Sequence, residues 1–216
     1  MTVRLILASA SPARLDTLRR AGLDPEVIVS GVDESLMSEP DAAALALALA
    51  TLKGQAVLAR IAAQGLGPER TLLVACDSVL ELDGQLHGKP ASADVAVERL
   101  TAMSGRSGVL HTGHFVADAS TGSEVSRSAA TKVHFAQLTR EEITAYVATG
   151  EPQAVAGAFT LDGLGGAFVR GIEGDPHNVV GISLPLLRLM AMELGVAWTD
   201  LWRRPVTPPG ARGHGR

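Results

Sequence analysis

The sequence predicts an α/β fold: a single domain in which a mixed, twisted sheet is flanked by helices. Three observations lead to this prediction. Short apolar runs alternate with helical patterns in the first half of the chain, and two long strand patterns follow one another in the middle. The 216 residues are 46% hydrophobic and 19% charged, a balance that supports a packed core. We expect that domain to span residues 1–202.

The first half of the chain alternates strand and helix. Ser11 suits the cap of a helix, Pro12 its first position and Gly22 its end. The elements predicted here are a strand over residues 3–8, a helix from Pro12 to Gly22, a strand over 26–30, a long Ala/Leu-rich helix from Asp41 to about Gln64, and a strand over 71–75 that ends at Cys76-Asp77-Ser78.

The second half begins with a hairpin and ends with a helix. Asp83-Gly84 is a hairpin turn, and Thr139 with Glu142 forms a capping box. The predicted elements are hairpin strands over residues 79–82 and 85–87, a helix over 92–103, antiparallel strands over 109–117 and 124–135, a helix from Thr139 to Gly150, a strand over 167–172 and a helix over 184–194.

Composition narrows the class of protein. The net charge of -4 argues against a nucleic-acid binder that neutralises phosphates. Cys76 is the single cysteine, so a reducing compartment, the cytoplasm, is expected. The apolar runs are too short for a signal peptide or a membrane span; the longest, residues 42–50, indicates a helix of a water-soluble protein. Residues 203–216 are rich in Pro, Gly and Arg and predict a disordered tail.

The segment from Ser9 to Arg14 joins a strand to a helix N-terminus. Free backbone N–H groups and the helix dipole favour an anion there, and Arg14 would add a forked donor. An ordinary capped turn explains the same residues.

Acidic and basic side chains stand near other predicted strand ends. Asp77 follows an apolar strand, where a carboxylate can bind a metal or accept a proton from water; a turn-forming Asp is the alternative. Asp33-Glu34 can hold a hard cation or form a solvated turn. Lys89 precedes Pro90, which favours an extended backbone at the lysine. Lys89 can neutralise phosphate, or it can be an ordinary residue at the point where the chain leaves a hairpin. Lys53 lies in the long helix, where a surface lysine is the simpler interpretation.

Taken in order, these segments resemble the Maf family, the septum-formation proteins regarded as nucleoside triphosphate pyrophosphatases. The resemblance spans residues 3 to about 195. It is carried by Leu7-Ala-Ser-Ala-Ser-Pro-Ala-Arg14, Asp33-Glu34, Lys53, Asp77-Ser78-Val79, Gly88-Lys89-Pro90, Gly150-Glu-Pro152, Ala156-Gly157-Ala158-Phe159, and Gly174-Asp175 with Asn178-Val-Val-Gly181.

The resemblance implies an elongated α/β fold with a substrate cleft, like that of inosine triphosphatases, in a protein that is often a homodimer. It implies hydrolysis of a nucleoside triphosphate to the monophosphate and pyrophosphate with Mg²⁺ or Mn²⁺. By position, Asp77 would be the proton acceptor and a metal ligand together with Asp33 or Glu34. Phosphate binding would fall to Ser9, Ser11, Arg14, Lys53 and Lys89.

This chain departs from the usual pattern of the family in ways that resemble its actinobacterial branch. Ala13, Ser78 and Asp162 replace residues associated with base choice, and Ala154-Val155 replaces a usual Asp-Lys. A carboxylate at Asp162 would accept from the two adjacent N–H groups of guanine, so we hypothesise a preference for guanine-type bases or broad specificity.

Two other functions stay open at this stage. The protein can be a non-catalytic nucleotide-binding regulator of cell division, although a carboxylate facing an anion favours a metal-dependent enzyme over a binding module. It can also be a different phosphohydrolase, which releases orthophosphate instead of pyrophosphate.

Overall fold

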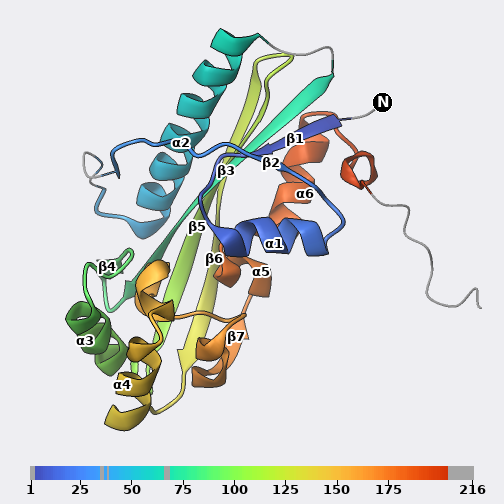
Figure 1. Ribbon diagram of the computed structural model, residues 1–216. Coiled ribbons are helices and arrows are strands. Elements are labelled where there is room, and N and C mark those ends of the chain that lie inside the picture. The colour runs from blue at the N-terminus through green and yellow to red at the C-terminus, as the bar shows by residue number, and fades with distance from the viewer. Residues whose placement is uncertain (1–2, 35–36, 38, 66–68, 204–216) are drawn as a thin grey trace, which may run out of the picture.

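A computed structural model describes residues 3–34, 37, 39–65 and 69–203. These residues form a seven-stranded mixed sheet in the order β2-β1-β3-β5-β6-β7, with β4 paired to β3 beside that path. The strands are β1 (Val3–Leu7), β2 (Glu26–Val27), β3 (Arg70–Leu82), β4 (Gln85–His87), β5 (Ser107–Asp118), β6 (Ser123–Phe135) and β7 (Val169–Glu173). The helices are α1 (Pro12–Arg20), α2 (Ala42–Gln64), α3 (Ala93–Met103), α4 (Arg140–Ala148), α5 (Pro176–Val180) and α6 (Leu184–Glu193). Figure 1 shows an elongated molecule built along β3, β5 and β6.

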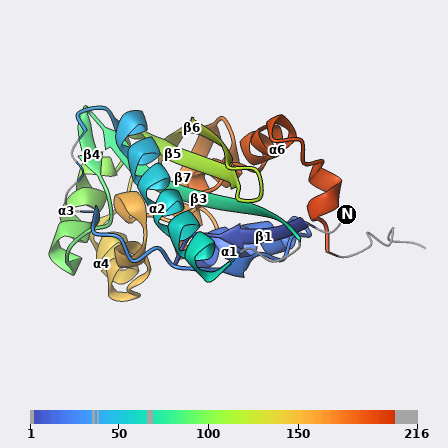
Figure 2. The same cartoon turned by 90° about the horizontal axis from the view of Figure 1, so that it is seen from above.

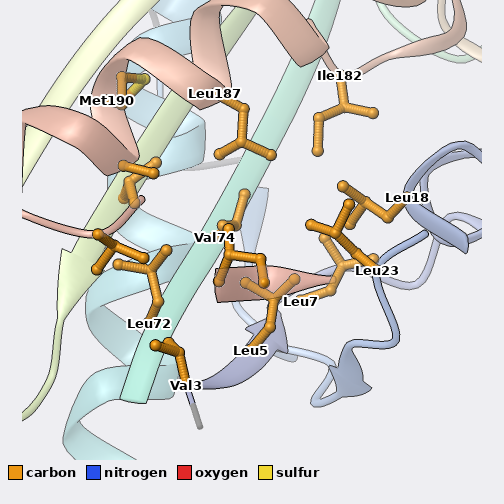
Figure 3. Packing of buried hydrophobic residues seen from close by; sticks show 14 of the residues in the cluster. Val3, Leu5, Leu7, Leu18, Leu23, Leu72, Val74, Ile182, Leu187 and Met190 are labelled. Carbon is orange, nitrogen blue, oxygen red and sulfur yellow. The ribbon is translucent and has the colours of Figure 1, made fainter. Parts of the chain in front are cut away.

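The two faces of the sheet are covered by different helices. Alternate residues of β1 and β3 pack against α1 and α6, in a cluster that includes Leu7, Val74, Leu18 and Leu187 (Figure 3). Their neighbours along the strands face α2, which is seen lying across the sheet in Figure 2. A separate core around Leu100 joins α3 and α4 to the far ends of the long strands. The fold is therefore an α/β sheet with helices on both faces, as predicted.

One edge of β3 is left open in its middle. β1 pairs with β3 only as far as Val74, and β4 pairs with it only from Leu80 onward. On the opposite edge, β5 pairs with β3 without interruption. The stretch from Ala75 to Val79 therefore lacks a strand neighbour on the edge that β1 and β4 share, and this gap sets the position of the site.

The prediction that the third strand ends near Asp77 is wrong. β3 continues to Leu82, because antiparallel pairing with β5 satisfies its backbone beyond the apolar run. The predicted second strand is also shorter than expected, since only Glu26 and Val27 pair with β1. The hairpin at Asp83-Gly84 and the capping box at Thr139 are confirmed. The short helix α5 and the 3-10 turns around residues 151–168 were not predicted.

The prediction that every apolar run is too short to span a membrane does not hold for helix α2. Its 23 residues are long and apolar enough, with a window of mean hydropathy 1.6, to cross a membrane by length and composition. A core helix can pass the same test, and α2 packs on the sheet through Ala50, Val57 and Ile61. We therefore treat α2 as a core helix. Of the predicted tail, residues 204–216 lie outside the described residues, and Arg203 donates hydrogen bonds to Val3 O and Gly22 O.

Candidate active site

The centre of the site is the open stretch of β3. Because successive side chains of a strand point to opposite faces, Asp77 faces α2 and Ser78 faces α1. Asp77 forms an ion pair with Lys53 of α2, and Ser78 accepts a hydrogen bond from Arg14 Nη2 at 3.0 Å. Two cationic side chains from two helices thus meet adjacent residues of one strand.

Lys53 lies between two carboxylates. Its ammonium contacts Asp77 Oδ1 and lies 2.8 Å from Glu34 Oε1. The side chains of Lys53 and Asp77 are 12% and 13% exposed, whereas that of Glu34 is 52% exposed. The inner pair is therefore partly shielded from water, which strengthens its attraction, while Glu34 closes the cluster from the solvent side.

Two glycines allow α2 to approach the strands closely enough for this contact. A Cβ on Gly54, next to Lys53, would lie 2.1 Å from the ring of Phe115. A Cβ on Gly113, which pairs with Asp77 across the sheet, would lie 2.2 Å from Ala46 O. Helix and sheet therefore meet backbone to backbone beside the Lys53–Asp77 pair.

Arg14 is held by the protein in a fixed orientation. Its Nε donates to Gly181 O at 2.7 Å and its Nη1 donates to Ser9 Oγ at 3.2 Å. Ser78, which accepts from Nη2, is itself 3.0 Å from Thr112 Oγ1. The planar guanidinium has five N–H donors, so two remain for a ligand. Neither the carbonyl of Gly181 nor Thr112 was predicted to take part in the site.

The turn before α1 has the expected capped geometry. Ser11 Oγ accepts from Arg14 N at 3.4 Å, and Ser9 Oγ accepts from Ser11 N at 3.2 Å. The cap interpretation of Ser11 is therefore confirmed. It does not compete with anion binding, since other backbone N–H groups of the first turn stay unpaired within the helix.

Lys89 projects from the loop between β4 and α3. The carbonyl just before it, Gly88 O, accepts from Arg99 Nη1 at 2.5 Å and from Gly157 N at 3.1 Å. Lys89 is exposed and makes no ion pair with any residue that the structure describes. Its charge is therefore available to an incoming anion, on a backbone that is fixed immediately upstream.

A cleft of about 750 Å³ brings almost all of the predicted residues together. That volume is in the range of small-molecule sites. The predicted residues that line it are Ser9, Ser11, Ala13, Arg14, Glu34, Lys53, Asp77, Ser78, Lys89 and Asp162. Asp33 is exposed and is not among the lining residues. Of these two adjacent carboxylates, Glu34 is the one that lines the cleft.

The carboxylates of Asp77 and Glu34 fit a divalent metal in part. Both already face one positive charge, the ammonium of Lys53, and carboxylate oxygens are the ligands that Mg²⁺ prefers. Within the described ranges, no three His, Cys, Asp or Glu side chains gather to hold an ion. Among the described residues, Asp77 and Glu34 would therefore supply two ligands, and the others would come from substrate phosphates and water, as is common for Mg²⁺.

Cys76 and two histidines of β5, His111 and His114, provide neither a nucleophile nor a pair of metal ligands. Cys76 is fully buried, and burial raises the pKa of its thiol to about 12, so it is not a nucleophile at neutral pH. His111 and His114 have different surroundings: His111 Nε2 lies 3.3 Å from Glu81 Oε2 without forming a hydrogen bond, whereas His114 Nε2 accepts a hydrogen bond from Ser183 N.

Comparison with known proteins places nearly the whole chain in one group. The family model described as Maf-like protein matches residues 4–194. A nucleoside triphosphate pyrophosphatase of Salinispora tropica is 56% identical over 204 residues, 94% of this chain and 89% of that protein. Proteins of the same name from Streptomyces avermitilis and Cutibacterium acnes are 55% and 53% identical, and cover 92% and 95% of this chain and 94% and 97% of their own lengths.

Proposed function

The chain belongs to the Maf family, and we propose that it hydrolyses nucleoside triphosphates to the monophosphate and pyrophosphate. One observation carries the proposal: Asp77, a carboxylate in mid-strand, lies in a cleft whose walls also bring in Arg14, Lys53 and Lys89. Three cations suit a triphosphate, and a carboxylate among them suits proton transfer better than simple anion binding. The names of the relatives at 53–56% identity support the same activity.

In this reaction water attacks the α-phosphorus, and the bond from that phosphorus to the bridging oxygen of the β-phosphate breaks. The proton of the attacking water passes to Asp77, and the electron pair of the broken bond leaves with pyrophosphate. Arg14, Lys53 and Lys89 stabilise the charge on the phosphates as it shifts toward the leaving group.

We propose Mg²⁺ or Mn²⁺ as the cofactor, held by Asp77 and Glu34. Such an ion, when bound, supplies positive charge at the phosphates and lowers the pKa of a water. Lys53 contacts both carboxylates, so its ammonium would have to share them with the metal or turn toward a phosphate.

The expectations about cellular location, oligomeric state and partners stay predictions. These are a cytoplasmic location, homodimer formation, and the absence of nucleic acid or membrane partners. The net charge of -4 supports the expectation about nucleic acid.

The test compares Asp77→Asn with wild type on a panel of nucleoside triphosphates, with Mg²⁺ or Mn²⁺ and product separation by anion exchange. Asp94→Asn is the matched control, because Asp94 is an exposed carboxylate in the first turn of α3. We expect monophosphate and pyrophosphate from wild type and the control, and a loss of at least about 100-fold in Asp77→Asn, the scale of a general base.

Other products would contradict the proposal in distinguishable ways. Diphosphate with orthophosphate would assign a different phosphohydrolase. Tight nucleotide binding without turnover by wild type, with either metal, would favour the non-catalytic regulator of cell division.

A further inference from the structure

The carboxylate of Glu151 lies inside a loop formed by residues 160–165. Its Oε1 accepts from Thr160 Oγ1, from Tyr146 OH at 3.1 Å and from Gly165 N at 3.1 Å. Its Oε2 accepts from Leu164 N at 3.1 Å. Two backbone and two side-chain donors therefore surround one carboxylate.

Tyr146 closes the same network from α4. Its hydroxyl donates to Glu151 and also accepts from Thr160 N at 3.1 Å. Burial is the main cause that raises the pKa of Tyr146 to about 12, so this hydroxyl keeps its proton at neutral pH. Both ends of the loop, at Thr160 and at Gly165, are thus tied to one pair of side chains.

The loop wraps the carboxylate too closely for larger residues. A Cβ on Gly163 would lie 2.7 Å from Glu151 Oε1, and one on Gly165 would lie 2.2 Å from Tyr146 OH. Glycine at these places is therefore a condition for closing the loop on Glu151, and the shape of the loop depends on that side chain.

The loop carries one wall of the cleft. Phe159, Thr160, Leu161 and Asp162 line the same cleft as Arg14, Lys53 and Lys89. The charged residue of this wall is Asp162, which forms no ion pair with a residue that the structure describes, whereas Asp77 and Glu34 both face the ammonium of Lys53. An unpaired carboxylate repels phosphates. The wall therefore suits the part of a nucleotide that carries no phosphate, the nucleoside.

We propose that Glu151 is a positioning residue for nucleoside recognition, which sets the 160–162 wall without touching the substrate. The inference rests on the proposed nucleotide substrate. Burial alone would raise the pKa of Glu151, but the hydrogen bonds from Thr160, Gly165, Leu164 and Tyr146 outweigh burial and lower the pKa. The side chain is therefore a carboxylate at neutral pH, which accepts from all four donors and offers none of its own.

Glu151→Gln tests the role, because it keeps the size of the side chain but replaces one acceptor by an N–H₂ group that faces donors. Glu141→Gln, on the exposed first turn of α4, is the matched control. Two probes separate the walls of the cleft: nucleoside triphosphates, which use both, and inorganic triphosphate, which has no nucleoside. We measure KM and kcat for the nucleotides, the inhibition constant of inorganic triphosphate, and the dissociation constants of α,β-methylene nucleotide analogues.

For Glu151→Gln we expect KM and the analogue dissociation constants to rise about tenfold, the scale of one misplaced recognition contact, with kcat and the inhibition constant of inorganic triphosphate unchanged. Equal weakening of nucleotides and inorganic triphosphate would overturn the inference, as would no change in either. If wild type turns over no nucleotide, the proposed function fails, yet the analogue dissociation constants still decide this inference. If Glu151→Gln unfolds, Tyr146→Phe, which removes one donor to the carboxylate, is judged by the same measurements.

Discussion

At the scale of single residues, Lys53 is the positive charge that two carboxylates of the site share. It neutralises Asp77, with which it is largely buried, and also contacts Glu34. Without Lys53, the two carboxylates would face each other with no counter-charge between them, in a partly shielded place. The ammonium of Lys53 therefore supplies the counter-charge that the proposed divalent ion would also supply.

We predict opposite effects of Lys53→Met on metal affinity and on turnover. The dissociation constant for Mn²⁺, measured by calorimetry without nucleotide, should fall about tenfold, because the ion no longer competes with an ammonium. The kcat/KM for nucleoside triphosphates should fall by at least about 100-fold, because a phosphate-stabilising charge is lost. Unchanged Mn²⁺ affinity would show that these carboxylates do not hold the metal.

Asp162 allows a prediction about the base. It is exposed on the cleft wall, and its carboxylate can accept from two adjacent N–H groups of guanine but from one of thymine. Asp162→Gln should lower the ratio of kcat/KM for GTP to that for dTTP by about tenfold, as expected for a lost charged hydrogen bond. An unchanged ratio would remove Asp162 from base selection.

At the scale of elements, the docking of α2 on the sheet sets the distance from Lys53 to Asp77. That docking depends on Gly54 and Gly113, which have no side chains to separate helix from strands. Glycine inside a helix costs about 1 kcal/mol relative to alanine, so its presence mid-helix needs a packing reason, and Phe115 provides one.

Gly54→Ala should therefore destabilise the protein despite its better helix propensity. Overpacking against Phe115 costs about 1–3 kcal/mol, against a propensity gain of about 1 kcal/mol. Urea unfolding measures the net loss, and kcat/KM should fall with it because Lys53 moves. Gln55→Ala, at an exposed position of α2, is the control. In a protein that already carries Phe115→Ala, Gly54→Ala should lower the free energy of unfolding by less than it does when Phe115 is present. An equal loss in both backgrounds would reject this packing argument.

Much of each element, and the pairing of strands that follow one another in the chain, could be predicted from local patterns. The pairing of strands that are far apart in the sequence could not. Ser11 and Thr139 cap their helices as predicted, because caps are local hydrogen bonds. The length of β3 was missed because Asp77 and Ser78 break the apolar run. They stay in the strand through pairing with Gly113 and Thr112, far away in the sequence.

At the scale of the whole molecule, the site too depends on contacts between segments that are far apart in the sequence. The lining residues could be predicted from short motifs and the family resemblance, but their division between two faces of β3 depends on the strand continuing. The clamp of Arg14 on Gly181 and the loop around Glu151 join segments far apart in the chain. No local pattern indicates such contacts, so they needed the folded structure.

His114 couples the fold to pH through its position between the sheet and α6. It is fully buried in β5, with Nδ1 donating to Thr112 O at 3.0 Å and Nε2 accepting from Ser183 N at 2.8 Å. This arrangement requires the neutral ring, because a proton on Nε2 would face the Ser183 N–H. Burial is the largest cause that lowers the pKa of His114 to about 4.

The sign of the pH effect follows from the two states of His114. An unfolded histidine binds its proton near pH 6.5, and the folded one near pH 4, so between these values the unfolded state holds more protons. The free energy of unfolding should therefore fall as the pH drops through this window, by about 3 kcal/mol in total. Urea unfolding from pH 7 to pH 4 measures the loss. His114→Gln should be less stable at pH 7, but its free energy of unfolding should change less steeply with pH. His177→Gln, at a half-exposed histidine of α5, should keep the wild-type dependence of the free energy of unfolding on pH. Equal slopes in wild type and His114→Gln would mean that carboxylates, not this buried ring, cause the acid sensitivity.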